Sequence, residues 1–421
     1  MKTLRAATIR TVAFASTIIA SQLNTLPATA GYKSNTEAKF QTWIQQLWPQ
    51  AKAAGISRAT FNSAFKGVRL NWKLPDLAPP GMKPRDKTKN RQAEFGSPGR
   101  YFREKNINAL VQRGRKMRKK WSKTLKAIEA KYGVPQNIIL AVWGRETSFG
   151  AVKIPYDTVR SLATLSFMGR RKSFFHPELI GALKILQQGH ISRRKLKSSW
   201  AGAMGQTQML PRKFLKYAVD FDGDGRKNIW TSPPDALATT ARFLKAQGWN
   251  SGYSWGYEVT MPANFSCALE GPHRAQPIGN WVKSGLHRTR GRKFSNARLK
   301  TKASLLMPAG VFGPSFLVTK NFYVIKKYNE SDLYALFVGH IADRISTNKT
   351  FDGKWQKVST YTRAKVKVLQ KTLRREGYNI GKKIDGLIGF RSRVAIGSYQ
   401  QKHGMKRDCW PDKATLKRAA R

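Results

Sequence analysis

The sequence predicts a mainly α-helical protein that contains a small sheet-forming segment and ends in a separate helical unit. Apolar residues recur at helical spacing in most of residues 31–248. Between residues 250 and 345, tryptophan, glycine and proline become more frequent, and β-branched and aromatic residues alternate in FLVTKNFYVIKKY, which predicts short strands. Two helical patterns around a turn follow in residues 361–421. The length of 421 residues is sufficient for two or three domains.

The first thirty residues have the pattern of a secretory signal segment. Basic residues precede the apolar run TVAFASTIIA, and Ala28 and Ala30 have the spacing of a cleavage site. We therefore expect cleavage after Ala30 and export, to the periplasm if the cell has two membranes. No later stretch approaches the length of apolar sequence that a membrane-spanning helix needs, so no membrane span is expected.

The helices can be assigned in order from these patterns. Residues 31–70 predict two short helices, and residues 71–100, rich in proline, glycine and charge, predict a loop. A long basic helix is expected at 101–131, and it leads into a helix within 137–150. Further helical patterns occupy residues 156–193, 212–219 and 234–248.

The second half of the chain divides by composition. The strand-rich segment at 250–345 ends in the helical pattern SDLYALFVGHIADRI. The polar stretch at 346–360 predicts an interdomain linker. We therefore expect a first domain at 31–345 and a smaller helical domain at 361–421.

The charge of the chain is strongly positive. Lysine and arginine number 78 against 23 acidic residues, which gives a formal net charge of +55, and the basic residues are spread along the whole sequence. Such a surface favours polyanionic partners. Because export argues against nucleic acid, the expected partners are carboxylate-rich cell-wall polymers and anionic envelope surfaces.

Cys267 and Cys409 are the only cysteines. They could pair in an oxidising compartment. Because they fall in different predicted domains, however, the sequence favours two unpaired, buried thiols. Neither cysteine has the spacing of a metal ligand.

One acid stands out in the apolar segment NIILAVWGRETSFG at 137–150. Ile139, Trp143 and Glu146 follow one another at i, i+4 and i+7, which places them on one face of a helix. Gly150 can end that helix in the left-handed conformation. The sequence therefore places a carboxyl group on an apolar stripe in the last turns of a helix.

Both features of this position disfavour the carboxylate anion. Burial removes water from the charge, and the negative end of the helix dipole repels it. Glu146 should therefore have a raised pKa, as a general acid requires. Arg145 is adjacent in sequence but points to a different face. The alternative interpretation is a glutamate at the edge of the core with its carboxyl group in water.

Four motifs occur in a fixed order, namely ETSFG at 146–150, SWAGAMGQTQMLP at 199–211, VDFDGDGRKNIW at 219–230 and NFYVIKKYNES at 321–331. In this order and spacing, residues 35–345 resemble the membrane-bound lytic transglycosylase B family of peptidoglycan-cleaving enzymes. The C-terminal segment resembles the three-helix peptidoglycan-binding domain often appended to them. The resemblance implies a lysozyme-like α+β catalytic domain with a small sheet-containing insertion, followed by a three-helix domain.

The resemblance also implies a reaction for Glu146. Enzymes of this family are understood to use one catalytic glutamate, whereas most glycoside hydrolases use two carboxylates. The glutamate protonates the oxygen between N-acetylmuramic acid and N-acetylglucosamine. It then accepts the proton of the muramic C6 hydroxyl, which attacks C1 and forms a 1,6-anhydro sugar. No second acid follows Glu146 in its motif, and no cofactor is required.

Other site residues follow from the same resemblance. Ser199 and Gln208 are implied to face the catalytic glutamate and the N-acetyl group, although the small residues around them also suit a tight turn. Tyr328 and Asn329 are implied to bind sugar near the scissile bond, and Tyr334 to be a further aromatic residue of the cleft. The alternative is that the tyrosines belong to an ordinary strand and helix core.

The acidic loop at 219–230 predicts a calcium site. Asp220, Asp222 and Asp224 have the spacing of the first ligands of a calcium-binding helix–loop–helix. Thr231 replaces the bidentate glutamate expected at the twelfth position, and the resemblance offers Asp235 as the later acid. Any calcium there would be structural, and an empty loop is the alternative.

The leading hypothesis is thus an exported, monomeric lytic transglycosylase whose partner is the peptidoglycan glycan strand. A muramidase that adds water is one alternative. A non-catalytic protein that binds the wall or other polyanions through its basic surface is another.

Overall fold

A computed structural model describes residues 27–80, 97–263, 265–358 and 361–421. The chain divides into two compact units, one up to Trp48 and one from Pro49 to Arg421. The described part of the first unit is essentially helix α1 (Pro27–Gln46). Residues 1–26 of the predicted signal segment lie outside the described ranges, so cleavage after Ala30 remains a prediction. Within those ranges, no helix combines the length and the apolar character that crossing a membrane requires.

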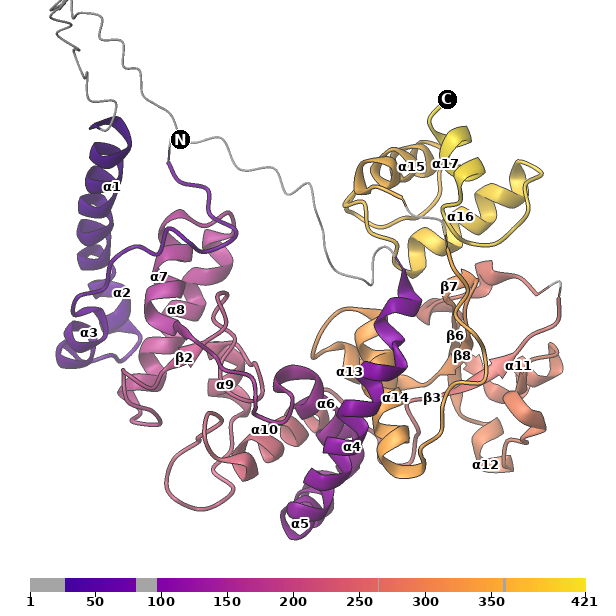
Figure 1. The fold of residues 1–421 in the computed structure, drawn as a ribbon, viewed down its shortest axis with the longest axis horizontal. Helices are drawn as coiled ribbons and strands as arrows, with labels where there is room; N and C mark the ends of the chain where they lie inside the picture. Colours follow the sequence, from indigo (N-terminus) through magenta and orange to yellow (C-terminus); the bar gives the residue numbers. More distant parts are fainter. Residues whose placement is uncertain (1–26, 81–96, 264, 359–360) are drawn as a thin grey trace, which may run out of the picture. The chain divides into compact units, whose positions relative to one another are not determined.

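The second unit begins with a helical region that continues to residue 246 (Figure 1). The predicted helix at 101–131 is two helices, because Trp121 leaves the helical conformation at φ −103° and ψ 24°. The helices of this region are α2 (Trp48–Ala53), α3 (Arg58–Phe65), η2 (Pro98–Phe102), α4 (Glu104–Lys120), α5 (Ser122–Tyr132), α6 (Gln136–Thr147), α7 (Thr158–Met168), α8 (Lys172–Gln187), α9 (Pro211–Tyr217) and α10 (Pro233–Ala246). Strands β1 (Tyr156–Asp157) and β2 (Lys197–Ser198) form a small antiparallel pair.

Helix α6 lies in the centre of the main core. Figure 1 shows it beside α4 and α14 (Asp332–Thr347), and the three helices pack against one another. Residues 138–144 of α6 are all buried, because this segment is apolar on every face. Helix α14 is buried along most of its length as well. The segment that carries Glu146 is therefore a rigid core helix rather than a surface element.

The segment after α10 contains a five-stranded antiparallel sheet in the order β4-β6-β8-β3-β5. Its central strands, β3 (Gly256–Thr260) and β8 (Ser315–Val318), pair with Gly256 opposite Val318. The remaining elements are η3 (Cys267–Leu269), η4 (Pro272–Arg274), β4 (Gln276–Pro277), α11 (Ile278–Lys283), β5 (His287–Arg288), η5 (Thr289–Gly291), α12 (Asn296–Leu299), β6 (Lys302–Leu306) and β7 (Pro308–Val311). The mainly helical fold with a small sheet is confirmed.

The strand predicted over FLVTKNFYVIKKY is half wrong. Strand β8 ends at Val318, and helix α13 (Lys320–Lys326) begins directly afterwards. The Thr319 hydroxyl accepts a hydrogen bond from the Asn321 N–H at 3.2 Å and caps this helix. A short run of apolar residues fits both periodicities, so the cap decides where the strand ends.

The C-terminal part consists of the helices α15 (Arg363–Arg375), α16 (Phe390–Lys402) and α17 (Lys413–Ala419), which share a core of their own. The predicted linker before them is packed against the first domain. Its Trp355 stacks on Phe102 with ring centroids 4.8 Å apart, and Phe351 stacks on His340 at 3.8 Å.

The prediction of two unpaired thiols is wrong. Cys267 and Cys409 form a disulfide with Cα atoms 6.2 Å apart, across a sequence separation of 142 residues. The pair can form because α16 packs directly against η3, so the two predicted domains are in contact. Gly397 of α16 leaves room for the sulfur of Cys409, where a Cβ atom would collide with it.

Candidate active site

The end of helix α6 is shaped by three successive residues in the left-handed region. Ser148, Phe149 and Gly150 have φ values of 50°, 60° and 77°. The first two are unfavourable for residues with a side chain, at a cost of about 1 kcal/mol or more each. A Cβ atom on Gly150 would lie 2.7 Å from Oε1 of Gln206, so only glycine fits there. Helix α6 therefore ends at Thr147, with Ser148 rather than Gly150 as its first left-handed residue.

Glu146 lies in the last turn of α6 and is half-buried. Its Oε1 accepts a hydrogen bond from the Tyr334 hydroxyl at 2.5 Å. Burial raises the pKa of Glu146 above its ordinary value, although the Tyr334 hydrogen bond and the charges of Arg145 and Lys213 act in the opposite direction. The carboxyl group therefore holds its proton more strongly than a solvated glutamate does, which is the direction that the sequence predicts for a general acid.

Two tyrosines accompany the carboxyl group. Tyr334 sits in the first turn of α14, where the Ser331 hydroxyl accepts a hydrogen bond from its N–H. Tyr328 follows α13 and donates its hydroxyl to the Thr207 carbonyl at 2.7 Å. The two rings are nearly parallel, with centroids 6.5 Å apart. Burial, followed by the charge of Glu146, raises the pKa of both phenols, so both remain neutral.

Arg145 takes a different direction from Glu146, as expected. Its Nη2 donates to the Tyr101 hydroxyl at 2.7 Å, and its guanidinium lies 5.6 Å from the ring centroid of Phe337. The side chain therefore does not neutralise Glu146 through a direct bond, and it acts on the carboxyl group only through space. Sequence reasoning did not identify Tyr101, which lies outside the four motifs.

The motif at 199–211 forms a wall that contacts the end of α6. Gln206 ties this wall to the helix, because its Oε1 accepts from Trp143 Nε1 at 2.8 Å and its carbonyl accepts from the Thr147 hydroxyl at 3.0 Å. Sequence reasoning did not single out this residue, although it lies inside the motif. The Ser199 hydroxyl accepts from the Ala203 N–H at 3.2 Å and so braces its own turn. The tight-turn interpretation of this motif therefore describes Ser199 well.

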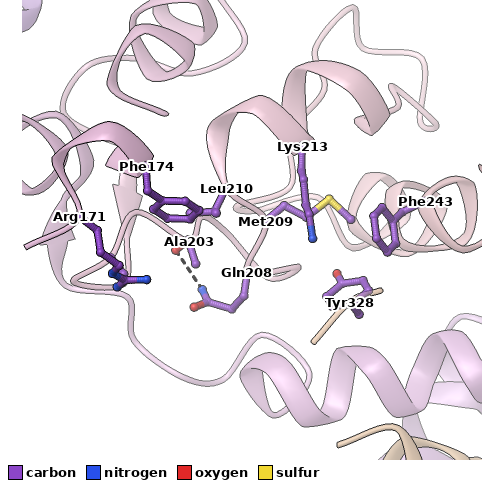
Figure 2. A pocket seen from close by; sticks show the side chains of 10 residues that line it. Arg171, Phe174, Ala203, Gln208, Met209, Leu210, Lys213, Phe243 and Tyr328 are labelled. Carbon is purple, nitrogen blue, oxygen red and sulfur yellow. Dashed lines mark hydrogen bonds between the residues drawn. The ribbon is translucent and has the colours of Figure 1, made fainter. Parts of the chain in front are cut away.

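Gln208 lines a cavity of about 270 Å³ beside this wall. Its φ is 51°, and its Nε2 donates to the carbonyls of Ala203 and Gly205 at 3.3 and 3.0 Å. Figure 2 shows Gln208 in the middle of the cavity, with Tyr328 toward one end. Gln208 and Tyr328 are thus brought together, next to the pair of Tyr334 and Glu146.

Asn329 is placed differently. It lines a larger cavity of about 780 Å³ between the α13–α14 connection and the C-terminal helices, together with Lys382 and Arg391. Its Oδ1 accepts from the Ser331 N–H at 3.2 Å. Asn329 therefore lines a different cavity from the one that Gln208 and Tyr328 share.

The acidic loop brings three of its four predicted ligands together. Carboxylate oxygens of Asp220, Asp222 and Asp235 lie within 4.8 Å of one another. Asp224 is not part of this group, and its Oδ1 accepts from the Arg226 N–H at 2.8 Å. The buried Asp235 also accepts backbone N–H groups with both oxygens, which holds the loop closed.

The arrangement offers one proton-donating carboxyl group, which Tyr334 and Tyr328 connect to a polar and aromatic cavity. Within the described ranges, no second carboxyl group is hydrogen-bonded to Glu146 or to its partner Tyr334. Such a site can protonate a leaving oxygen and take back a proton. A core helix that ends in this carboxyl group, with a small sheet alongside, defines a lysozyme-like domain.

Comparison with known families identifies this domain. Residues 39–343 match the Transglycosylase SLT domain, and residues 362–418 match the Putative peptidoglycan binding domain. The first match spans more than half of the chain, so the chain belongs to the SLT transglycosylase family.

Individual relatives agree with this assignment. SltB3 from Pseudomonas aeruginosa, in complex with NAG-anhNAM-pentapeptide, is 37% identical with a TM-score of 0.80, over 91% of this chain and 99% of that one. Escherichia coli Slt35 in complex with calcium is 30% identical with a TM-score of 0.52, over 61% of this chain and 80% of that one. Membrane-bound lytic murein transglycosylase B of Escherichia coli K12 is 32% identical over 228 residues, which are 51% of this chain. The match spans 58% of that protein's own length.

Proposed function

We propose that this protein is a lytic transglycosylase that cleaves the β-1,4 bond between N-acetylmuramic acid and N-acetylglucosamine in peptidoglycan. The observation that carries the proposal is the carboxyl group of Glu146, half-buried, bonded to the neutral hydroxyl of Tyr334 and without a carboxylate partner in the part of the chain that the structure describes. A water-adding glycosidase ordinarily needs a second carboxylate. One carboxyl group is sufficient when the nucleophile belongs to the substrate.

In this mechanism Glu146 donates its proton to the bridging oxygen while the bond from that oxygen to C1 of the muramic residue breaks. The C6 hydroxyl of the same residue attacks C1 and returns its proton to Glu146. The products are a 1,6-anhydromuramic end and a free hydroxyl on the next sugar, so atoms balance without water. The attack is intramolecular and benefits from proximity.

Two predicted residues are suited to hold the sugar. Gln208 presents a carboxamide that two backbone carbonyls fix in place, and Tyr328 presents an aromatic ring in the same cavity. Aromatic faces and fixed amides are typical contacts for sugar rings and N-acetyl groups. Ser199 supports the loop that carries Gln208, and Asn329 serves substrate parts that reach the larger cavity.

The test is digestion of purified peptidoglycan by the wild type and by Glu146→Gln. Wild-type products should be 18 mass units (about one water) lighter than hydrolysis products. The variant should bind the wall and lose activity by about 10²–10⁴-fold, the usual effect of a lost general acid. Products of hydrolytic mass would instead identify a muramidase, and unchanged lysis by the variant would remove Glu146 from the mechanism. Wall binding without cleavage in the wild type would indicate a non-catalytic binding protein.

The other parts of the chain fit an exported wall enzyme. We infer that residues 1–30 direct export and are removed after Ala30, which places the mature protein in the periplasm as a monomer. The family match of residues 362–418 supports wall binding by the C-terminal unit. The net charge of +55 favours additional binding to anionic envelope polymers.

We also infer a structural calcium ion in the acidic loop. The clustered oxygens of Asp220, Asp222 and Asp235 are the ligand type that calcium prefers. Burial and then Asp222 raise the pKa of Asp235 against its backbone hydrogen bonds, and a cation would relieve this repulsion. Calcium should raise the melting temperature by about 2–4 °C relative to chelator. Asp222→Asn should remove the difference, and an equal response of that variant would contradict the assignment.

A further inference from the structure

We propose that the cavity of about 270 Å³ beside Glu146 binds a carboxylate of the substrate, and that Lys213 is its specificity-determining residue. This proposal rests on the proposed function, since it names the chemical group that the same active site recognises. The ligand is the acidic side branch of a muramic residue, namely its lactyl group or the peptide attached to it.

The cavity adjoins the catalytic acid on the side of the tyrosines. Tyr328 lines it and stacks against Tyr334, which binds Glu146. Lys213, from the first turns of α9, lines it as well, and its charge acts on Glu146 through space. A group bound in this cavity is therefore attached to a sugar close to the scissile bond.

Lys213 is a cation without an ion-pair partner among the described residues. Its only hydrogen bond there runs from Nζ to the Lys327 carbonyl at 3.3 Å, and no carboxylate lies within ion-pair distance. Its ammonium lies 5.0 Å from the ring centroid of Phe243. Burial lowers the pKa of Lys213, while Glu330, Glu178 and Glu146 oppose that effect from a distance. A half-buried, unpaired ammonium is costly unless an anion reaches it.

A second cation stands at the other end of the cavity. Figure 2 shows Arg171 there, with Gln208 between it and Lys213. Arg171 Nε is bonded to Asp76 at 2.9 Å, and its guanidinium lies 5.4 Å from the ring centroid of Phe174. Arg171 is thus held by an ion pair that compensates its charge, which leaves Lys213 as the unpaired cation of the two.

The chemistry of the lining selects the ligand. The unpaired ammonium of Lys213 favours an anion, and the aromatic faces of Phe243 and Tyr328 favour an attached apolar or sugar surface. The glycan backbone is neutral, and only its muramic side branches carry carboxylates. A neutral chitin-like chain would leave Lys213 unpaired, so the cavity distinguishes muramic-containing strands from it.

The experiment compares three soluble NAG–NAM oligosaccharides. One bears peptide stems with free carboxylates, one bears the same stems fully amidated, and one lacks peptide and has a free lactyl carboxylate. Lys213→Met should raise KM at least about tenfold for the substrates whose carboxylate occupies the cavity. Amidated stems should be cleaved equally by wild type and variant. If KM rises only for the substrate with free peptide carboxylates, the carboxylate in the cavity comes from the peptide. If KM rises for the peptide-free substrate, it comes from the lactyl group.

The matched control is Lys216→Met, which removes the same charge from an exposed position of the same helix. It should leave all three KM values unchanged. If Lys213→Met instead slows all substrates by one factor and shifts the alkaline limb of every pH profile, Lys213 acts only through Glu146, and the proposal is overturned. It is also overturned if the variant matches the wild type on every substrate.

A binding measurement separates this proposal from the proposed function. Titration calorimetry with the inactive Glu146→Gln protein measures affinity for the same three oligosaccharides without turnover. A loss of at least about tenfold on adding Lys213→Met, confined to carboxylate-bearing ligands, supports the site even if the wild type proves to add water. Equal affinities in both proteins would exclude the site while leaving the cleavage reaction untouched.

Discussion

The half-buried Glu146 and the fully buried Glu270 have opposite charged surroundings. Glu146 has a tyrosine hydroxyl at 2.5 Å, and its neighbouring cations are held away from it. Glu270 receives two hydrogen bonds from the guanidinium of Arg393, at 2.6 and 2.9 Å, and both side chains are almost fully buried. Burial raises the pKa of Glu270 while Arg393 lowers it, and Glu270 and Asp332 raise the pKa of Arg393 against the effect of its burial. The guanidinium therefore stays charged beside Glu270.

The difference shows that burial alone does not make a catalytic acid. A buried carboxylate that receives two hydrogen bonds from one guanidinium is stabilised in its charged form and supports the fold. A half-buried carboxyl group whose only hydrogen-bond donor is a neutral hydroxyl has a raised pKa and no cation bonded to it. The sites of Glu270 and Glu146 are linked, because Arg393 also binds Asp332, two residues before Tyr334.

Arg393→Met should have the largest effect on stability. It leaves the fully buried Glu270 without a counter-charge, which costs about 3–5 kcal/mol in comparable pairs. Denaturant unfolding at neutral pH measures this loss. Arg391→Met, an exposed neighbour on the same helix, is the control and should change stability by less than about 0.5 kcal/mol. A loss as small as that of the control would show that the pair contributes nothing to folding.

Glu146→Gln should change the free energy of unfolding in the opposite direction, toward greater stability. Because burial raises the folded pKa of Glu146 above its unfolded value, the folded state binds this proton more strongly. The contribution of Glu146 to the free energy of unfolding is therefore fully present below its unfolded pKa of about 4.3. It is lost as the pH rises through the folded pKa of Glu146. The variant should therefore become more stable than the wild type as pH increases. Unfolding curves at several pH values test this, and a variant that is less stable at alkaline pH would contradict the raised pKa.

Tyr334→Phe should have the smallest effect of the three substitutions, and it tests whether the neutral hydroxyl sets the pKa of Glu146. Removing a hydrogen bond that favours the Glu146 anion raises the pKa of Glu146 further. The alkaline limb of the kcat profile should then move to higher pH, with kcat reduced by about tenfold, since one hydrogen bond to a charged group is lost. An alkaline limb that moves to lower pH would show that Tyr334 does not donate to the carboxylate.

Local sequence patterns predicted the structure correctly where it depends on a single helix or strand. The apolar stripe that ends in Glu146 correctly indicated helix α6, because side chains four and seven residues apart share a face in any helix. The pattern was ambiguous at FLVTKNFYVIKKY, where a capping threonine turns strand into helix within one residue. It was uninformative for Gln206, whose role depends on Trp143 and Thr147 of a distant segment.

By itself the sequence determined the mainly helical class, the family motifs, the acid at the end of α6 and the cluster of acids in the calcium-like loop. These depend on spacing within a single segment, which covalent geometry and helix periodicity translate directly into structure. Only the tertiary structure decided that Cys267 and Cys409 are bonded, that Tyr334 is the donor to Glu146, and that Lys213 faces the cavity. Such contacts join residues up to 188 positions apart, and they exist only because the packing of whole helices brings their side chains together.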